Sequence, residues 1–212
     1  MNPNNRLMGV VLGLAIAGLA GCGQAPTGVR GTTNSQVAAT STAALKAGFT
    51  RVHQAIFAKL DANHDGTIDE YEAGPTIPLN IFTKLDRNGD GSISQEQFIE
   101  FATAGGFFTG NDTEDKFFVR MRDYLATAFT KLDQPVGGAF SRGDGFLSRE
   151  ELSDKALAKL GLGFRYPTLN IQTTLVTVTD DLYKADDKTG DGKLSQGEFE
   201  DLYIDMVVAA LK

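Results

Sequence analysis

The chain has 212 residues, enough for one domain or two small ones, and 42% of them are apolar, as in an ordinary protein with a buried core. Its formal net charge is -7 and its sequence pI is near 4.8. Nucleic-acid binding needs clustered Lys and Arg side chains, so this balance argues against nucleic acid as a partner and is compatible with cations as ligands.

Residues 1–21 have the character of a secretory signal. Arg6 is their only charge, and residues 7–20 are an unbroken run of apolar residues and Gly. These 14 residues fall short of the ~20 that span a bilayer. The run ends in Leu-Ala-Gly-Cys22, which resembles a bacterial lipobox. That resemblance implies cleavage before Cys22 and lipidation of its thiol; an ordinary signal peptide with a chance cysteine is the alternative.

Cys22 is the only cysteine, which excludes an intrachain disulfide. We therefore expect a lipid-anchored, extracytoplasmic protein of the bacterial cell envelope. Gly23 follows Cys22 where an Asp would favour retention at the inner membrane, so the resemblance indicates the outer membrane if the host has one. Residues 22–44 are rich in small and polar residues, and we expect them to form a flexible tether.

An internal repeat begins after Leu45. Residues 57–61, 82–86 and 129–133 share the pattern Phe-x-Lys-Leu-Asp, and residues 183–187 are a looser copy. Apolar residues precede these copies at helical spacing and predict amphipathic helices. The two clearest stripes are Phe49, Val52, Ile56, Phe57 and Leu60, and Phe117, Phe118, Met121, Leu125, Ala128, Phe129 and Leu132. Each unit is therefore predicted to be helix, polar loop, helix, in an all-α fold.

The four units are predicted to form two pairs, over residues 45–104 and 112–212, joined by a Gly-rich linker over residues 105–111. The helix after the linker is expected to start near Asp112 or Thr113, whose side chains can cap its first turn. Residues 173–179 are rich in β-branched residues, which favour strands. We still expect a helix there, because the segment occupies the incoming-helix position of the fourth unit.

The first loop carries oxygen-bearing side chains at alternate positions, with Gly66 at position 6. Such a loop can surround a hard cation with oxygens if a bidentate Glu at position 12 completes the shell. These residues resemble an EF-hand calcium loop, and the four units resemble the calmodulin-like arrangement of that family. The resemblance implies Ca²⁺ ligation by Asp61, Asn63, Asp65, Thr67 (through its carbonyl), Asp69 and Glu72.

The second and fourth loops follow the same pattern with changes. The second has Asp86, Asn88, Asp90, Ser92, Ser94 and Gln97 at the ligand positions, and the fourth has Asp187, Thr189, Asp191, Lys193, Ser195 and Glu198. Gln97 offers one neutral oxygen where Glu offers two charged ones, so we expect weaker Ca²⁺ binding there and tolerance of Mg²⁺. An empty structural second loop is the alternative. We expect the fourth loop to bind.

The third loop is irregular. Its second half, from Asp144 to Glu151, fits positions 5 to 12. Helix register places position 1 at Asp133, eleven residues before Asp144 where four are expected. Either the loop bulges outward and still returns its ligands, or it has lost the ion, and Arg142 would be a poor neighbour for a cation.

Pairing of the loops has its own support, because EF-hand loops join in twos through an antiparallel bridge at position 8. That position holds Ile68, Ile93, Leu147 and Leu194, all of them branched and apolar. Generic core packing would explain the same four residues.

Three functions compete for this chain. A structural or sensory Ca²⁺-binding module that presents a surface to an envelope protein comes first, a plain Ca²⁺ buffer second, and an enzyme regulated by EF-hands third. Sensors expose a Met-rich groove, whereas this chain has only Met121 and Met206 beyond the signal. No catalytic motif surrounds His53 or His64, and both are expected to be exposed, so we expect no enzymatic activity.

Overall fold

A computed structural model describes residues 33–108, 113–133, 143–166, 168–175 and 177–212, and for residues 33–41 it describes the backbone only. The predicted signal peptide and Cys22 lie outside this range. Within the described residues, no helix has both the length and the apolar character needed to cross a membrane.

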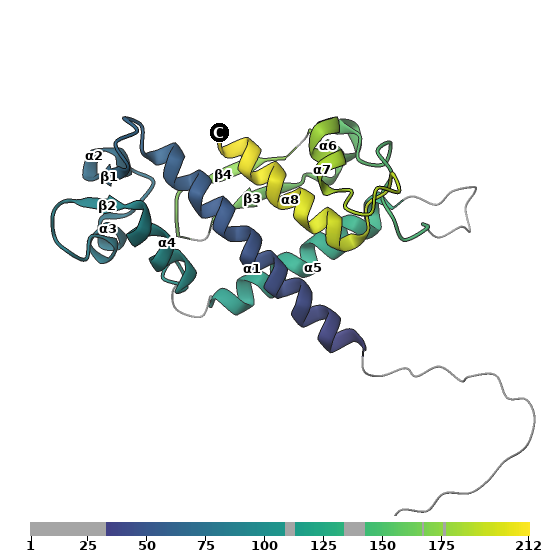
Figure 1. Cartoon of the computed structure of the whole chain (residues 1–212), viewed down its shortest axis with the longest axis horizontal. Coiled ribbons are helices and arrows are strands. Elements are labelled where there is room, and N and C mark those ends of the chain that lie inside the picture. The colour runs from purple at the N-terminus through teal and green to yellow at the C-terminus, as the bar shows by residue number, and fades with distance from the viewer. Residues whose placement is uncertain (1–32, 109–112, 134–142, 167, 176) are drawn as a thin grey trace, which may run out of the picture.

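The described residues form eight helices and four short strands (Figure 1). The first half of the chain contains α1 (Thr33–Leu60), β1 (Thr67–Asp69), α2 (Glu70–Ala73), α3 (Leu79–Leu85), β2 (Ser92–Ser94) and α4 (Gln95–Thr103). The second half contains α5 (Glu114–Leu132), α6 (Asp154–Leu160), β3 (Gly163–Arg165), β4 (Gln172–Thr174), α7 (Asp180–Asp186) and α8 (Gln196–Leu211). The fold is therefore mainly helical, as predicted, with helix-loop-helix units in succession.

The predicted bridges between paired loops are confirmed. β1 and β2 are antiparallel with Ile68 opposite Ile93. Leu147 and Leu194 form an isolated antiparallel bridge, in which their N–H and C=O groups exchange hydrogen bonds of 2.8 and 2.9 Å. All four side chains are fully buried, so each bridge also anchors its loops in the core.

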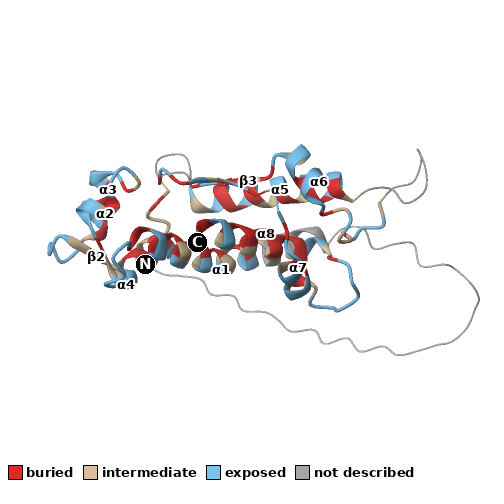
Figure 2. Cartoon of the chain, turned by 90° about the horizontal axis from the view of Figure 1, so that it is seen from above, coloured by how far each residue is buried: buried red, intermediate tan, exposed pale blue. Residues whose placement is uncertain are grey.

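Both predicted helical stripes are buried, and they bring the two pairs of units together. α1 of the first unit packs along α8 of the fourth and also contacts α4 and α5. The Phe49 ring meets Phe118 and Phe164 edge to face, with centroids 4.9 and 5.9 Å apart. The two pairs of loops consequently lie at opposite ends of a shared helical core (Figures 1 and 2).

The helix expected over residues 173–179 is wrong. β4 covers the first two residues of that segment and pairs with β3, placing Phe164 opposite Thr173, while residues 175 and 177–179 lie in no helix. α7 begins only at Asp180, after the Thr179 side chain accepts a hydrogen bond from the N–H of Leu182. The β-branched Thr173 and Thr174 suit a pleated strand, and the incoming helix of the fourth unit is short because it follows this hairpin.

The tether expected over residues 22–44 is wrong in its second half, because α1 already begins at Thr33. Alanine is the strongest helix former, and residues 38–44 contain four of them next to the packed stripe of α1. The stripe fixes the helix from Leu45 onward, and the alanines extend it backward.

Part of the predicted linker is a core element. Phe107 is fully buried, and its ring centroid lies 5.2 Å from that of Phe98 and 5.4 Å from that of Tyr166. Residues 109–112 lie outside the described range. The predicted cap is confirmed, because the Thr113 hydroxyl accepts a hydrogen bond from the N–H of Lys116 at the start of α5.

The exposed position expected for His53 is wrong. The side chain is 4% exposed, and its Nε2 lies 2.7 Å from the hydroxyl of Tyr166. His53 lies beside Val52 on the buried side of α1, facing a residue more than a hundred positions away. Burial lowers the pKa of His53 to about 4.

Candidate metal centres

The four loops share one geometric frame. In each, Oδ2 of the position-1 Asp accepts a hydrogen bond from the N–H of the position-6 Gly, at 2.8 to 3.1 Å. The φ angles of these glycines, +79 to +87°, lie in the left-handed region that favours Gly. The pairs are Asp61 and Gly66, Asp86 and Gly91, Asp133 and Gly145, and Asp187 and Gly192.

In the first loop, the position-12 carboxylate reaches back across the loop from α2. Oε1 of Glu72 accepts hydrogen bonds from the N–H groups of Ala62 and Asn63, at 3.0 and 3.1 Å. Its Oε2 accepts one from the N–H of Asp69, whose side chain caps α2 in return. The capping box fixes the rotamer of Glu72, and the loop N–H groups hold its carboxylate against positions 2 and 3.

The fourth loop repeats this arrangement. Oε1 of Glu198 accepts hydrogen bonds from the N–H groups of Lys188 and Thr189, at 2.9 and 3.2 Å. Its Oε2 accepts one from the N–H and one from the hydroxyl of Ser195, at 2.8 and 2.7 Å. The Asp187 carboxylate accepts hydrogen bonds from the N–H groups of the loop at positions 4 to 6. The first and fourth loops therefore hold the position-12 carboxylate in equivalent places.

The second loop keeps the same frame, but its position-12 residue is the neutral Gln97 in place of a Glu. Oε1 of Gln97 accepts a hydrogen bond from the N–H of Ser94 at 2.7 Å, so the amide oxygen is committed to the cap of α4. The remaining end of the amide, Nε2, donates to Oδ1 of Asn88 at 3.3 Å. This loop therefore presents an N–H donor to the position-3 side chain, which disfavours a cation at that point.

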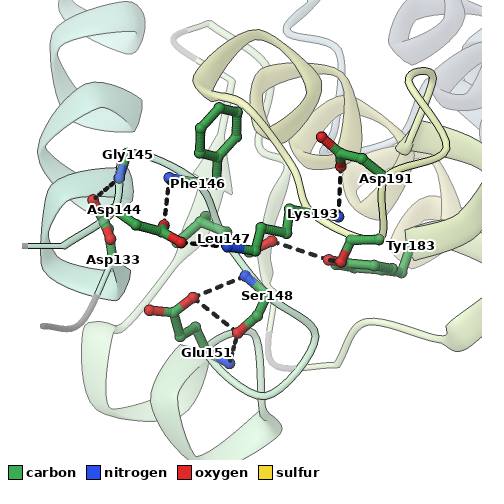
Figure 3. A network of polar contacts seen from close by, with 11 residues as sticks. Asp133, Asp144, Gly145, Phe146, Leu147, Ser148, Glu151, Tyr183, Asp191 and Lys193 are labelled. Carbon is green, nitrogen blue, oxygen red and sulfur yellow. Dashed lines mark hydrogen bonds and ion pairs between the residues drawn. The ribbon is translucent and has the colours of Figure 1, made fainter. Parts of the chain in front are cut away.

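The third loop forms the same hydrogen bond between residues that lie farther apart in the sequence (Figure 3). Its Asp133 accepts from Gly145 N–H at 3.1 Å, although twelve positions separate the two residues. Oε2 of Glu151 accepts from the N–H and hydroxyl of Ser148, as Glu198 does from Ser195. Residues 134–142, and with them Arg142 and the equivalents of positions 2 and 3, lie outside the described range.

Gly143 allows the backbone to lie close to the Asp133 side chain. A Cβ atom on Gly143 would lie 1.9 Å from Oδ1 of Asp133, so any other residue would force the two apart. That Oδ1 atom is buried and has no hydrogen-bond partner among the described residues. An orphaned carboxylate oxygen at position 1 is a free ligand for a cation.

Hydrogen bonds also tune the position-5 carboxylates. The Thr67 hydroxyl and N–H hold the pKa of Asp65 below its usual range, and Ser92 does the same for the pKa of Asp90. Burial alone would raise the pKa of Glu198, but hydrogen bonds from Ser195 and the backbone at positions 2 and 3 outweigh it and lower that pKa. These hydrogen bonds thus favour the ionised form of Asp65, Asp90 and Glu198.

The donor sets fit a hard cation, because every proposed ligand is an oxygen. Among the described residues, no three Asp, Glu, His or Cys side chains are gathered into a ready-made cluster. In this structure the loop carboxylates are instead held by backbone N–H groups. A carboxylate offers about four acceptor sites, so these hydrogen bonds leave lone pairs for a metal.

Sequence reasoning missed a link between the third and fourth loops. The Tyr183 hydroxyl lies 3.0 Å from the carbonyl oxygen of Leu147 and 2.8 Å from that of Gly192, one in each loop. The sequence contains a sign of this link, because Tyr183 adds a hydroxyl at the repeat position that holds Phe in the other three units. The ion pair between Lys193 and Asp144 was also missed, because only the bridge between the loops brings these residues together.

Comparison with known proteins agrees with this geometry for the first half of the chain. The family model described as EF hand matches residues 54–72 and 79–102, which are the first and second units. A search of the curated proteins found no match. The matched segments and the loop geometry support an EF-hand family, and that family implies calcium as the ligand of these loops.

Proposed function

We propose that this protein is a Ca²⁺-binding structural module of the cell envelope, in which the first and fourth loops carry the ions. One observation carries the proposal. Glu72 and Glu198 each reach across their loops and accept the N–H groups of positions 2 and 3, in two units far apart in sequence. A position-12 carboxylate held across its loop is the group that closes a shell of oxygens around Ca²⁺.

The remaining two loops then serve mainly as partners. The bridges between Ile68 and Ile93, and between Leu147 and Leu194, tie each altered loop to a regular one. A second loop without a position-12 carboxylate suits Mg²⁺ better than Ca²⁺, because Mg²⁺ keeps several of its waters and needs fewer protein ligands.

A structural role is favoured over a calmodulin-like sensor by the packing of the helices. Sensors open on binding Ca²⁺ and expose a Met-rich groove. Here Met121 and Met206 are both buried, and the apolar stripe of α1 is covered by α4, α5 and α8. Opening one pair of units would therefore disturb the core that both pairs share. We propose that Ca²⁺ stiffens the ends of the molecule and thereby shapes a surface for an envelope protein partner.

The anchoring to a membrane is proposed from the sequence. The apolar run over residues 7–20 and the Leu-Ala-Gly-Cys22 match support lipidation of Cys22. Growth on labelled palmitate should label the wild-type protein and leave Cys22→Ser unlabelled. A labelled Cys22→Ser protein, or an unlabelled wild type in the same membrane fraction, would remove the anchor from the proposal.

Calorimetric titration of the full chain with Ca²⁺ and then Mg²⁺ tests the metal sites. We expect two Ca²⁺ ions, assigned to the first and fourth loops by the loss of one ion each in Glu72→Gln and Glu198→Gln. Extracellular calcium modules bind Ca²⁺ with a Kd of ~10⁻⁴–10⁻³ M, and we expect values in that range. No heat and no thermal shift at millimolar Ca²⁺ would overturn the proposal. Strong Ca²⁺-dependent binding of a hydrophobic dye would replace the structural module by a sensor.

A further inference from the structure

The third loop contains a cationic group supplied by its neighbour. Lys193, at position 7 of the fourth loop, extends its ammonium across the loop bridge to Oδ2 of Asp144, at position 5 of the third (Figure 3). Oδ1 of the same carboxylate accepts the N–H of Phe146 at 3.0 Å. Both oxygens of a ligand position are therefore engaged before any metal arrives.

The regular loops lack such a group. Asp65, at position 5 of the first loop, accepts only neutral donors from Thr67 and Asn63. In the fourth loop, Asp191 accepts the backbone N–H of Lys193, while the ammonium of that lysine points away to Asp144. The same side chain therefore leaves its own loop acidic and partly neutralises the loop next to it.

We infer that Lys193 is a resident counter-cation at Asp144, which occupies that ligand position of the third loop and keeps Ca²⁺ from binding there. The inference rests on the proposed function, since it assumes that these loops otherwise take Ca²⁺.

Charge and geometry both support this role. The described acids at the ligand positions of the third loop are Asp133, Asp144 and Glu151, and one ammonium lowers their summed charge from -3 to -2. A dication entering the loop would have to displace the ammonium from Asp144 and would be repelled by it afterwards. In the described part of the loop, the N–H groups of Gly145 and Ser148 are satisfied without an ion, by Asp133 and Glu151.

The arrangement also explains how an ion-free loop supports its partner. The exchange of backbone hydrogen bonds between Leu147 and Leu194 and the two contacts of the Tyr183 hydroxyl hold the loops side by side. The Lys193 ion pair adds a third link on the same side. With the charge of Asp144 partly balanced, the third loop can keep the fourth in shape while only the fourth binds Ca²⁺.

Replacing Lys193 by an uncharged residue of similar length tests the inference. We expect the full-length Lys193→Met chain to bind one Ca²⁺ ion more than the wild type, or to bind at one site about tenfold more tightly, in calorimetric titration. Adding Glu151→Gln to Lys193→Met should abolish the gain, which assigns it to the third loop. Without Ca²⁺, Lys193→Met should melt at a lower temperature than the wild type, and Ca²⁺ should raise its melting temperature by more.

Lys188→Met is the matched control. Lys188 lies in the same loop and pairs with Asp201 on α8. Its replacement removes one positive charge, as Lys193→Met does, but leaves the ion pair at Asp144 in place. We expect its third-loop binding to equal that of the wild type. If Lys193→Met fails to fold, Lys193→Gln removes the charge with a smaller change in polarity.

The outcomes separate the two claims. Identical isotherms for wild type, Lys193→Met and Lys188→Met would overturn the role of Lys193 and leave the first and fourth sites standing. So would a wild-type third site that Glu151→Gln removes, because the loop would then fill in the presence of the lysine. No heat in any variant would overturn the proposed function and this inference together.

Discussion

The N-terminal and C-terminal pairs of loops differ in how one loop of each pair departs from the regular ligand pattern. Each pair combines a regular loop, the first or the fourth, with an altered one. The second loop keeps its length and replaces the position-12 Glu by Gln97. The third keeps acids at positions 1, 5 and 12, but lengthens its first half and receives the ammonium of Lys193.

What both pairs retain is the bridge and the hydrogen bond from the position-6 Gly to the position-1 Asp. Neither contact involves a cation. The frame of a loop and its set of metal ligands therefore depend on different atoms. A loop that binds no ion can keep the contacts that join it to its partner.

The largest effect should come from breaking the contact between the two pairs. Phe107→Ala removes a fully buried ring that packs on Phe98, Phe101 and Tyr166, and it should lower the free energy of unfolding by about 3–5 kcal/mol. Urea unfolding followed by circular dichroism measures it. Phe146→Ala, at a side chain 40% exposed, is the control and should cost far less. Two separate transitions, with only the first shifted, would mean that the pairs do not share one core.

Acid should loosen the same contact through His53. Its folded pKa of about 4 lies below the unfolded value of 6.5, so the unfolded chain binds this proton more tightly. The free energy of unfolding should therefore fall as the pH drops from 6.5 to 4, by about 3 kcal/mol in total.

The contribution of His53 has to be measured against a variant, because other groups titrate in the same range. Burial raises the pKa of Asp186 to about 6, so protonation of that carboxyl stabilises the folded chain as the pH falls and opposes the effect. The difference between wild type and His53→Gln across pH 4 to 6.5 isolates the histidine. A constant difference over that range would contradict the prediction.

A third test compares the regular loops with each other. Glu72→Gln should weaken the first site by about a hundredfold, roughly 2.7 kcal/mol, because one neutral oxygen replaces a bidentate carboxylate. Glu198→Gln should do the same at the fourth site, since the two carboxylates make equivalent contacts. Titration calorimetry gives both values. Glu70→Gln removes an exposed charge from the same helix, and an equal loss there would show that the effect is general electrostatics.

The smallest effect should come from restoring the second loop. Gln97→Glu replaces the amide that donates to Asn88 by a carboxylate and should tighten Ca²⁺ binding there by about tenfold, near 1.4 kcal/mol. Gln95→Glu adds the same charge to an exposed position of α4 and is the control. Equal gains in both variants would remove the special role assigned to position 12.

The features predicted well from the sequence depend on neighbours along the chain. Helical stripes, capping residues and the alternation of oxygen ligands around Gly66 all lie within about a dozen residues, where spacing dictates geometry. The hairpin of β3 and β4 was missed for a related reason. The repeat position favoured a helix over residues 173–179, whereas in the fold the local preference for a strand prevailed at Thr173 and Thr174.

By itself, the sequence determined the units, their loops and the residues of the bridges, because each is a short pattern whose parts meet through the backbone alone. Only the tertiary structure decided that α1 lies along α8, that His53 is buried against Tyr166, and that Lys193 pairs with Asp144. Those contacts join residues 49 to more than 150 positions apart. Their geometry follows from how whole helices pack, and no local spacing records it.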